Sequence, residues 1–210
     1  AAPSANSSGK PSPTKASHVI FDLNGKIDMI IDGGNAEFGL ESTIIDVSEE
    51  IPTLLRPGAI TKEMIENVIG QIEIDPTILT KPSQNLVPKA PGMKYTHYSP
   101  KAEVILVQGN DLNIVQQNIN HFVKRELQLS KKVGILATDQ TKQYYDCGIV
   151  LSLGNRENLE EIGSNLFKHL RKFDFLGVDV VYSETVPEKG EGLAIMNRLQ
   201  KAAGYKIINV

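Results

Sequence analysis

Residues 103–137 read EVILVQGNDLNIVQQNINHFVKRELQLSKKVGILA, and their pattern indicates the fold of the larger part of this chain. Residues 103–107 are mostly apolar and β-branched, which is typical of a buried strand. Residues 111–128 place apolar side chains at helical spacing and predict an amphipathic helix. Residues 132–137 are a second apolar strand. A strand, a helix and a strand in this order indicate parallel strands joined by a helical crossover.

The same alternation continues to the end of the chain. We expect strands at 149–153 and 179–182 and helices at 156–173 and 191–203. The loops that follow the strands contain no G-x-G-x-x-G, so a dinucleotide site is not expected there. Residues 102–210 are therefore predicted to form a complete, mostly parallel, doubly wound α/β domain.

The preceding residues have a different character. Residues 75–101 hold five prolines and little apolar periodicity, which predicts a linker without helix or central strand. The linker ends in the aromatic and basic run MKYTHY, which a passive spacer does not need. Residues 1–74 have fewer elements: short strands at 27–32, 42–47 and 52–56, and a helix from the Thr61 cap to Ile69.

Composition places the chain among globular α/β proteins. Of its 210 residues, 40% are apolar and 22% are charged. The formal net charge of -3 argues against binding nucleic acid by bulk charge. No apolar run of about 18 residues and no signal peptide is present. The single Cys147 excludes a disulfide framework, so we expect a soluble cytoplasmic protein.

The first candidate site is the stretch APSANSSGKPSPT at residues 2–14. It combines hydroxyls, an amide, a glycine and a lysine just before a predicted helix. Backbone N–H groups and hydroxyls at such a point suit a phosphate or a carboxylate. The alternative is a flexible tail followed by an ordinary cap.

Ser42 and Arg56 are the next candidates. Ser42 enters a strand after a glycine-containing turn and can donate to a ligand's carboxylate, or it can bond its own backbone. Arg56 lies where a strand meets the Pro57-Gly58 turn, which suits phosphate recognition, although a plain surface arginine fits as well. No Ser/His/Asp triad can be assembled, and the four histidines are isolated, so neither a covalent nucleophile nor a protein metal site is expected.

Four segments, taken in order, carry a resemblance to a known family. They are APSANSSGKPSPT (2–14), GLESTIID (39–46), LRPGAI (55–60) and APGMKYTHYSP (90–100). Together they resemble the threonylcarbamoyl-AMP synthase family in its longer form, in which a YrdC-type catalytic domain is joined to a C-terminal Rossmann-like domain. The resemblance covers essentially the whole chain.

The resemblance implies a domain organisation. Residues 1–74 correspond to the C-terminal portion of the YrdC-type twisted α/β sheet domain, residues 75–101 to a linker that acts as a lid over the active site, and residues 102–210 to the Rossmann-like domain. The family's P-T-E-T-x-Y-G-L and K-x-R segments are not found. We therefore expect the chain to start in the middle of the catalytic domain and to be inactive alone.

The implied reaction makes threonylcarbamoyl-AMP and pyrophosphate from L-threonine, bicarbonate and ATP with Mg²⁺. The enzyme is thus expected to be a nucleotidyltransferase that needs no protein nucleophile or acid/base residue. Its product goes to tRNA-modifying transferase proteins, which build threonylcarbamoyladenosine next to the anticodon.

The resemblance also assigns residues to the substrates. The nucleotide-binding set is Ser4, Asn6, Ser12, Arg56 and Tyr95, and the threonine-binding set is Ala2 and Ser42. Two other interpretations compete with an enzyme: an RNA-binding module, and a ligand-sensing regulatory domain without catalysis.

Overall fold

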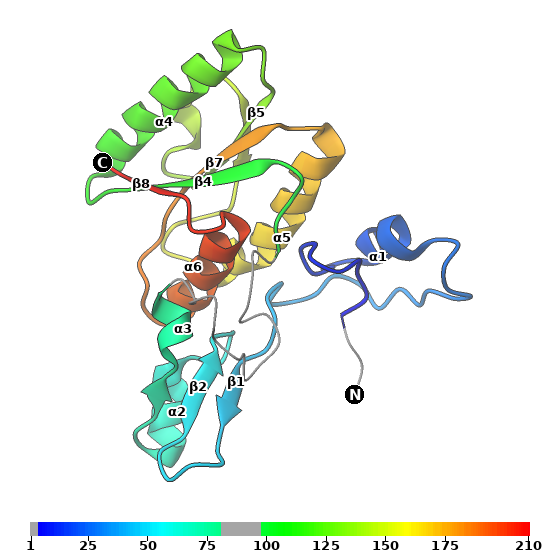
Figure 1. Cartoon of the computed structure of the whole chain (residues 1–210), viewed down its shortest axis with the longest axis vertical. Helices are drawn as coiled ribbons and strands as arrows, with labels where there is room; N and C mark the ends of the chain where they lie inside the picture. Colours follow the sequence, from blue (N-terminus) through cyan, green and yellow to red (C-terminus); the bar gives the residue numbers. More distant parts are fainter. Residues whose placement is uncertain (1–3, 81–97) are drawn as a thin grey trace.

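The computed structural model describes residues 4–80 and 98–210 (Figure 1). The larger part is built on a five-stranded sheet whose strand pairs are all parallel, in the order β6-β5-β7-β4-β8. The strands are β4 (Glu103–Gln108), β5 (Val133–Ala137), β6 (Ile149–Ser152), β7 (Val180–Glu184) and β8 (Ile207–Asn209). The predicted parallel α/β fold is confirmed, with β8 as an additional edge strand.

Helices cover both faces of this sheet. Helix α4 (Leu112–Gln128) packs Val115, Ile119 and Val123 on one face, together with β-strand side chains such as Val107. Helices α5 (Leu159–Leu176) and α6 (Glu191–Ala202) pack on the other face, where Leu106 points. Neighbouring strand residues point to opposite faces, so both faces are buried and the sheet is doubly wound.

The N-terminal part has a smaller sheet. Its strands are β1 (Ile44–Asp46), β2 (Thr53–Arg56) and β3 (Glu73–Ile74), with β1 antiparallel and β3 parallel to β2. Helix α1 (Ala16–Leu23) precedes this sheet, and α2 (Lys62–Ile69) and α3 (Pro76–Leu79) accompany it. The predicted start of α2 is confirmed, because the Thr61 side chain accepts a hydrogen bond from the Met64 N–H.

Two local predictions are wrong. Residues 27–32 form no strand, and Met29 and Ile31 are 75% and 85% exposed. No strand in the described ranges runs beside them, and an unpaired strand cannot satisfy its backbone. The proline-rich stretch does contain a helix, α3, because Pro76 occupies the first helical position and the Asp75 side chain caps the Thr77 N–H at 2.9 Å.

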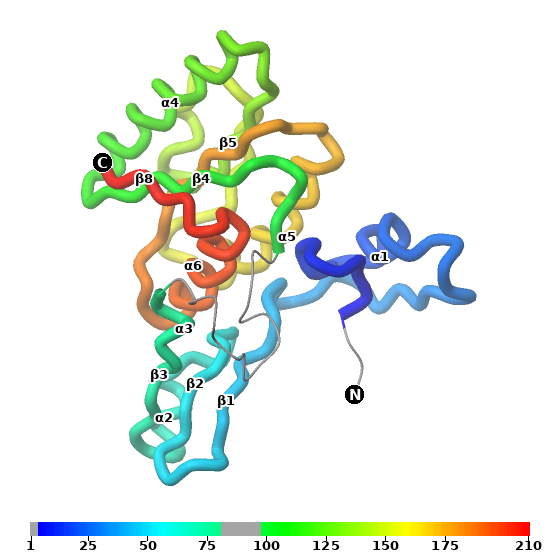
Figure 2. Tube along the Cα trace, viewed as in Figure 1, coloured from blue at the N-terminus to red at the C-terminus, as the bar shows by residue number. Residues whose placement is uncertain are grey.

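The two parts meet along α5 and α6. The tube view shows the N-terminal loop beside α5 and α3 next to α6 (Figure 2). Arg171 of α5 donates to the Asp22 carboxylate at 2.8 Å and to the Pro11 carbonyl, and Asn197 of α6 donates to the Ile78 carbonyl. Among the helices of residues 4–80 and 98–210, none has the length and apolar character needed to cross a bilayer.

Candidate functional site

Three of the predicted site residues gather around Glu41, a residue of the GLEST segment. The Ser12 hydroxyl donates to Glu41 Oε1 at 2.6 Å. Arg56 donates from Nε to the Ser42 carbonyl at 2.9 Å and from its terminal nitrogen to Ser42 Oγ at 3.3 Å. The structure therefore brings Ser12, Ser42 and Arg56, which are up to 44 residues apart in the numbering, into one cluster.

The β1–β2 hairpin creates this cluster. Arg56 ends β2 opposite Ile44, which places its side chain next to Ser42 just before β1. The turn after Arg56 passes very close to the same backbone: a Cβ on Gly58 would lie 2.4 Å from the Thr43 nitrogen and 2.7 Å from the Glu41 carbonyl oxygen. Only glycine permits this approach.

A residue of the second domain completes the cluster. Arg198 of α6 is fully buried, donates from Nε to Glu41 Oε2 at 2.9 Å, and reaches the Pro57 carbonyl at 2.7 Å. Its guanidinium also lies over the Tyr98 ring, 5.8 Å from the centroid. Burial alone would raise the pKa of Glu41, but the charge of Arg198 and the hydrogen bonds from Ser12 and Arg198 hold that pKa below its ordinary value.

The remaining predicted residues lie elsewhere or outside the described ranges. Ser4 is exposed, and Asn6 donates to the carbonyls of Ser7 and Lys10, which shapes the loop. Among the described residues, no hydrogen bond joins Ser4 or Asn6 to the cluster around Glu41. Ala2 and Tyr95 lie outside the described residues.

The Asn6 loop nevertheless has an unused acceptor. Asn6 Oδ1 is buried, and no residue in the described part of the chain donates to it. The Ser7 N–H is held by the Asp22 carboxylate, which Arg171 of α5 also contacts. The loop is thus anchored to the second domain and leaves one buried polar atom available to a ligand.

Glu41 and Arg198 are site residues that the sequence analysis missed. Glu41 stands inside a segment already singled out for its neighbour Ser42. Arg198 has a weaker signal: it shares the face of α6 with Ala194 and Ala202 at a spacing of four residues, where an apolar side chain is the norm. A charged residue in such a stripe indicates a buried partner.

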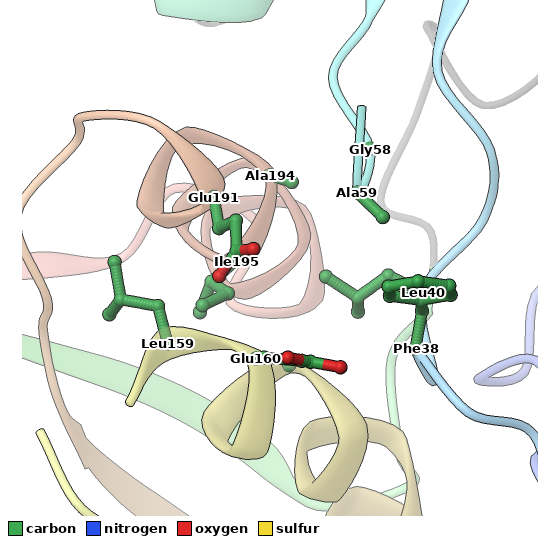
Figure 3. Close-up of a pocket in the computed structure, with 10 residues that line it drawn as sticks. Phe38, Leu40, Gly58, Ala59, Leu159, Glu160, Glu191, Ala194 and Ile195 are labelled. Carbon is green, nitrogen blue, oxygen red and sulfur yellow. The ribbon is translucent and has the colours of Figure 1, made fainter. Parts of the chain in front are cut away.

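Two cavities adjoin the segment that carries Glu41. One, of about 460 Å³, is lined by Glu41, Ser42 and Thr43 together with apolar side chains of the N-terminal part. Figure 3 shows a smaller apolar one, where Phe38, Leu40 and Ala59 face Leu159 and Ile195 of α5 and α6. The first therefore offers a binding space directly beside the predicted threonine-binding serine.

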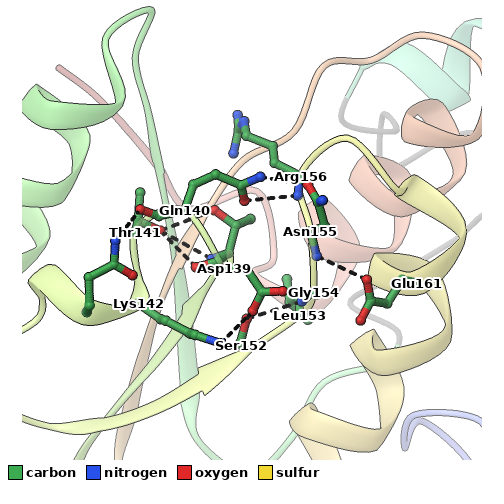
Figure 4. A network of polar contacts seen from close by, with 12 residues as sticks. Asp139, Gln140, Thr141, Lys142, Ser152, Leu153, Gly154, Asn155, Arg156 and Glu161 are labelled. Carbon is green, nitrogen blue, oxygen red and sulfur yellow. Dashed lines mark hydrogen bonds and ion pairs between the residues drawn. The ribbon is translucent and has the colours of Figure 1, made fainter.

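A second polar cluster lies at the carboxyl ends of β5 and β6 (Figure 4). Ser152 and Lys142 donate to the Asp139 carboxylate at 2.7 and 2.8 Å, and Gln140 donates to Asn155. These polar groups form hydrogen bonds with one another, so the cluster links the loops that follow β5 and β6. No group of three or more His, Cys, Asp or Glu side chains within residues 4–80 and 98–210 is arranged to hold a metal.

Two family models match the chain. One, described as the C-terminal domain of threonylcarbamoyl-AMP synthase, matches residues 60–204, and one described as "Telomere recombination" matches residues 1–58. The chain is 51% identical to a threonylcarbamoyl-AMP synthase of Pyrococcus abyssi, covering 100% of this chain and 59% of that protein. It is 47% identical to the Bacillus subtilis enzyme of the same name, covering 99% and 58%.

A solved structure agrees with this similarity. The crystal structure of P. abyssi Sua5 complexed with L-threonine superposes with a TM-score of 0.88 at 51% identity, covering 99% of this chain and 58% of that one. The chain thus spans less than two thirds of the length of the relatives that it matches.

Proposed function

The chain belongs to the threonylcarbamoyl-AMP synthase family, and we propose that the protein containing it makes threonylcarbamoyl-AMP and pyrophosphate from L-threonine, bicarbonate and ATP. The observation that carries the proposal is the cluster in which Ser12, Ser42 and Arg56 meet beside a cavity. Hydroxyls and a guanidinium gathered in one place suit a substrate set with a carboxylate and several phosphates.

The chemistry needs positioning more than reactive side chains. The amine of threonine adds to bicarbonate and water leaves, which gives a carbamate. A carbamate oxygen then attacks the α-phosphorus of ATP, the bond from that phosphorus to the bridging oxygen breaks, and pyrophosphate leaves with the electron pair. Such a nucleotidyl transfer depends on holding anions in line and balancing their charge.

The geometry suggests a role for each clustered residue. Ser42 Oγ accepts a hydrogen bond from Arg56, so its own proton is free to be donated to the threonine carboxylate. Arg56, oriented by Ser42, faces the phosphates, and Ser12, oriented by Glu41, contacts the nucleotide. Ser4 and Asn6 at the phosphates, Ala2 at threonine and Tyr95 over the nucleotide stay as predictions.

Helix α6 gives the second domain a part in this site. Arg198 holds both the Glu41 carboxylate and the Pro57 carbonyl, which flank Ser42 and Arg56. We propose that the Rossmann-like domain acts through Arg198 to keep the substrate-binding segments in place.

Mg²⁺ is expected to arrive with the nucleotide. Both Glu41 oxygens are hydrogen-bonded, and the described part of the chain groups no set of metal ligands. We therefore assign the ion to the ATP phosphates and derive no step through it. The product would pass to tRNA-modifying transferases in the cytoplasm.

Pyrophosphate release tests the proposal. The intact protein that contains residues 1–210 should release pyrophosphate from ATP only when L-threonine and bicarbonate are both present. Arg56→Ala should lower this rate by about a hundredfold, as expected for losing a charge that stabilises the transition state. Arg125→Ala is the matched control, because Arg125 is exposed on α4, far from the cluster.

Four other outcomes would contradict parts of the proposal. Release that does not need threonine would overturn the assigned reaction, and release by residues 1–210 alone would show that the fragment is not inactive. RNA binding with steep salt dependence and no pyrophosphate release would favour the RNA-binding module instead. Nucleotide binding by the second domain without any turnover would favour the regulatory domain.

A further inference from the structure

Lys201 is a buried lysine that takes no part in the hydrogen bonds around Glu41. It lies on α6 one turn after Arg198, and only 3% of its surface is exposed. Within residues 4–80 and 98–210, no hydrogen bond or ion pair engages its ammonium group. Lysines are rarely this buried, and one whose donors are all uncommitted can bind an anion that reaches it.

The surroundings of Lys201 are positively charged. The charges that act on it are those of Arg198 on its own helix, Arg56 on β2, and the Glu41 carboxylate. In the described part of the chain, Lys201, Arg198 and Arg56 thus share the single Glu41 carboxylate. Glu41 is also fully engaged, since one oxygen accepts from Ser12 and the other from Arg198.

The other two cations, Arg198 and Arg56, already donate hydrogen bonds to protein groups. Arg198 bonds Glu41 and the Pro57 carbonyl, and Arg56 bonds Ser42. The Lys201 ammonium has three donors and has committed none of them within the described residues. Among the described residues, the cluster thus has more positive than negative charge, and Lys201 is the group best able to bind an anionic ligand.

The protonation state agrees with this role. Burial, with the charge of Arg198 next, lowers the pKa of Lys201 from 10.5 to about 8. At pH 7 the group is still mostly protonated, and an incoming anion would favour the charged form further. Lys201 is therefore a cation at neutral pH and gains most from an anionic ligand.

We propose that Lys201, contributed by the second domain, is a phosphate-binding residue that pairs with the polyphosphate of the nucleotide or with the pyrophosphate product. The assignment rests on the proposed function, because that function supplies the phosphate ligand. Helix α6 would then supply Lys201 for the phosphates as well as Arg198 for Glu41.

Calorimetric titration of the intact protein with pyrophosphate, ATP and inorganic phosphate tests the inference. Lys201→Met keeps the aliphatic stem and removes the charge, and we expect about tenfold to hundredfold weaker pyrophosphate and ATP binding, the loss that corresponds to one charged hydrogen bond. Lys201→Arg should recover most of the affinity. Lys124→Met on α4 is the control and should bind as the wild type does, because Lys124 is exposed and pairs with Asp146 at the surface.

Thermal unfolding separates ligand binding from a purely structural role. Without ligand, Lys201→Met should be at least as stable as the wild type, since a positive charge is removed from the neighbourhood of Arg198 and Arg56, and pyrophosphate should stabilise it less. Affinities for pyrophosphate and ATP within twofold of the wild type would overturn the inference, whether or not stability changes. If only ATP binding is weakened, Lys201 contacts the bound nucleotide substrate. If ATP and pyrophosphate binding are weakened equally, Lys201 contacts the β- and γ-phosphates, which leave as pyrophosphate.

These measurements distinguish a failure of the Lys201 assignment from a failure of the proposed reaction. If the wild type releases no pyrophosphate with threonine and bicarbonate, the proposed reaction fails, yet Lys201→Met can still show the loss of pyrophosphate binding. If the wild type is active and Lys201→Met binds phosphates normally, only the Lys201 assignment fails.

Discussion

Burial changes the protonation equilibrium of individual side chains in this molecule, and His18 is an example outside the site. Its ring Nδ1 accepts a hydrogen bond from the Thr14 N–H at 3.1 Å. Burial, followed by the charges of Arg171 and Lys15, lowers the pKa of His18 from 6.5 to about 4. The ring is therefore neutral at pH 7, as its acceptor role requires.

This depressed pKa predicts a pH dependence of stability. As the pH falls from about 6.5 to about 4, the unfolded chain takes up the proton first, so the free energy of unfolding should decrease over that interval. His18→Gln keeps an acceptor for Thr14 but does not titrate, and its stability should fall less steeply. Urea midpoints between pH 4 and 7 measure both slopes, and equal slopes would show that His18 does not contribute.

Among the secondary-structure elements, the β1–β2 hairpin depends on contacts within a short segment, whereas the polar side chains of α6 contact residues far away in the sequence. The hairpin is a local structure, and the turn that follows β2 requires glycine at position 58, where it passes close to the backbone of Glu41 and Thr43. The apolar pattern of α6 predicts the helix, but its proposed role depends on the contacts that Arg198 makes with Glu41 and Pro57. A helix can thus be predicted without its polar face being understood.

Gly58→Ala tests the hairpin. The new methyl group would meet backbone atoms of Thr43 and Glu41, which cannot move as a side chain can, so we expect a loss of about 1–3 kcal/mol in unfolding free energy. Pyrophosphate release by the intact protein should fall as well, because Ser42 and Arg56 are displaced. Gly33→Ala is the control, since a Cβ there meets nothing within 4 Å; similar losses in both variants would contradict the role of the close approach.

At the scale of the whole molecule, two buried ion pairs join the N-terminal part to the second domain. Arg171 pairs with Asp22 at 2.8 Å, and Arg198 pairs with Glu41 at 2.9 Å. Hydrogen bonds from Ser7 and Ser12 further engage these two carboxylates. The two parts should therefore unfold together.

Calorimetric unfolding of residues 1–210 should show one transition. Arg198→Met leaves the Glu41 charge buried without its partner, so we expect a loss of about 3–5 kcal/mol and separation into two transitions. Adding Glu41→Gln should recover part of the loss. Arg125→Met removes an exposed arginine and should change stability by less than about 1 kcal/mol; two transitions in the wild type would contradict the coupling.

The elements of the second domain were predictable because each depends on neighbours in the sequence. The alternation of apolar strands and amphipathic helices identified β4, α4, β5, β6, α5, β7 and α6 and the parallel sheet. The run at 27–32 shows the limit: it has strand-like residues, but a strand also needs a partner, and none lies beside it among the described residues. Pro76 illustrates another limit, since proline breaks a helix interior but begins a helix well.

The α/β class, the parallel sheet of the second domain and the candidates Ser12, Ser42 and Arg56 could all be predicted from the sequence, because periodicity and short motifs are properties of adjacent residues. The three-dimensional packing was needed to show that β7 lies between β4 and β5 and that Arg198 contacts Glu41, a residue 157 positions away. It was also needed to show that Lys201 is buried in a positively charged cluster. Such contacts depend on how helices and sheets pack, and the free energy of that packing is not encoded in any local pattern.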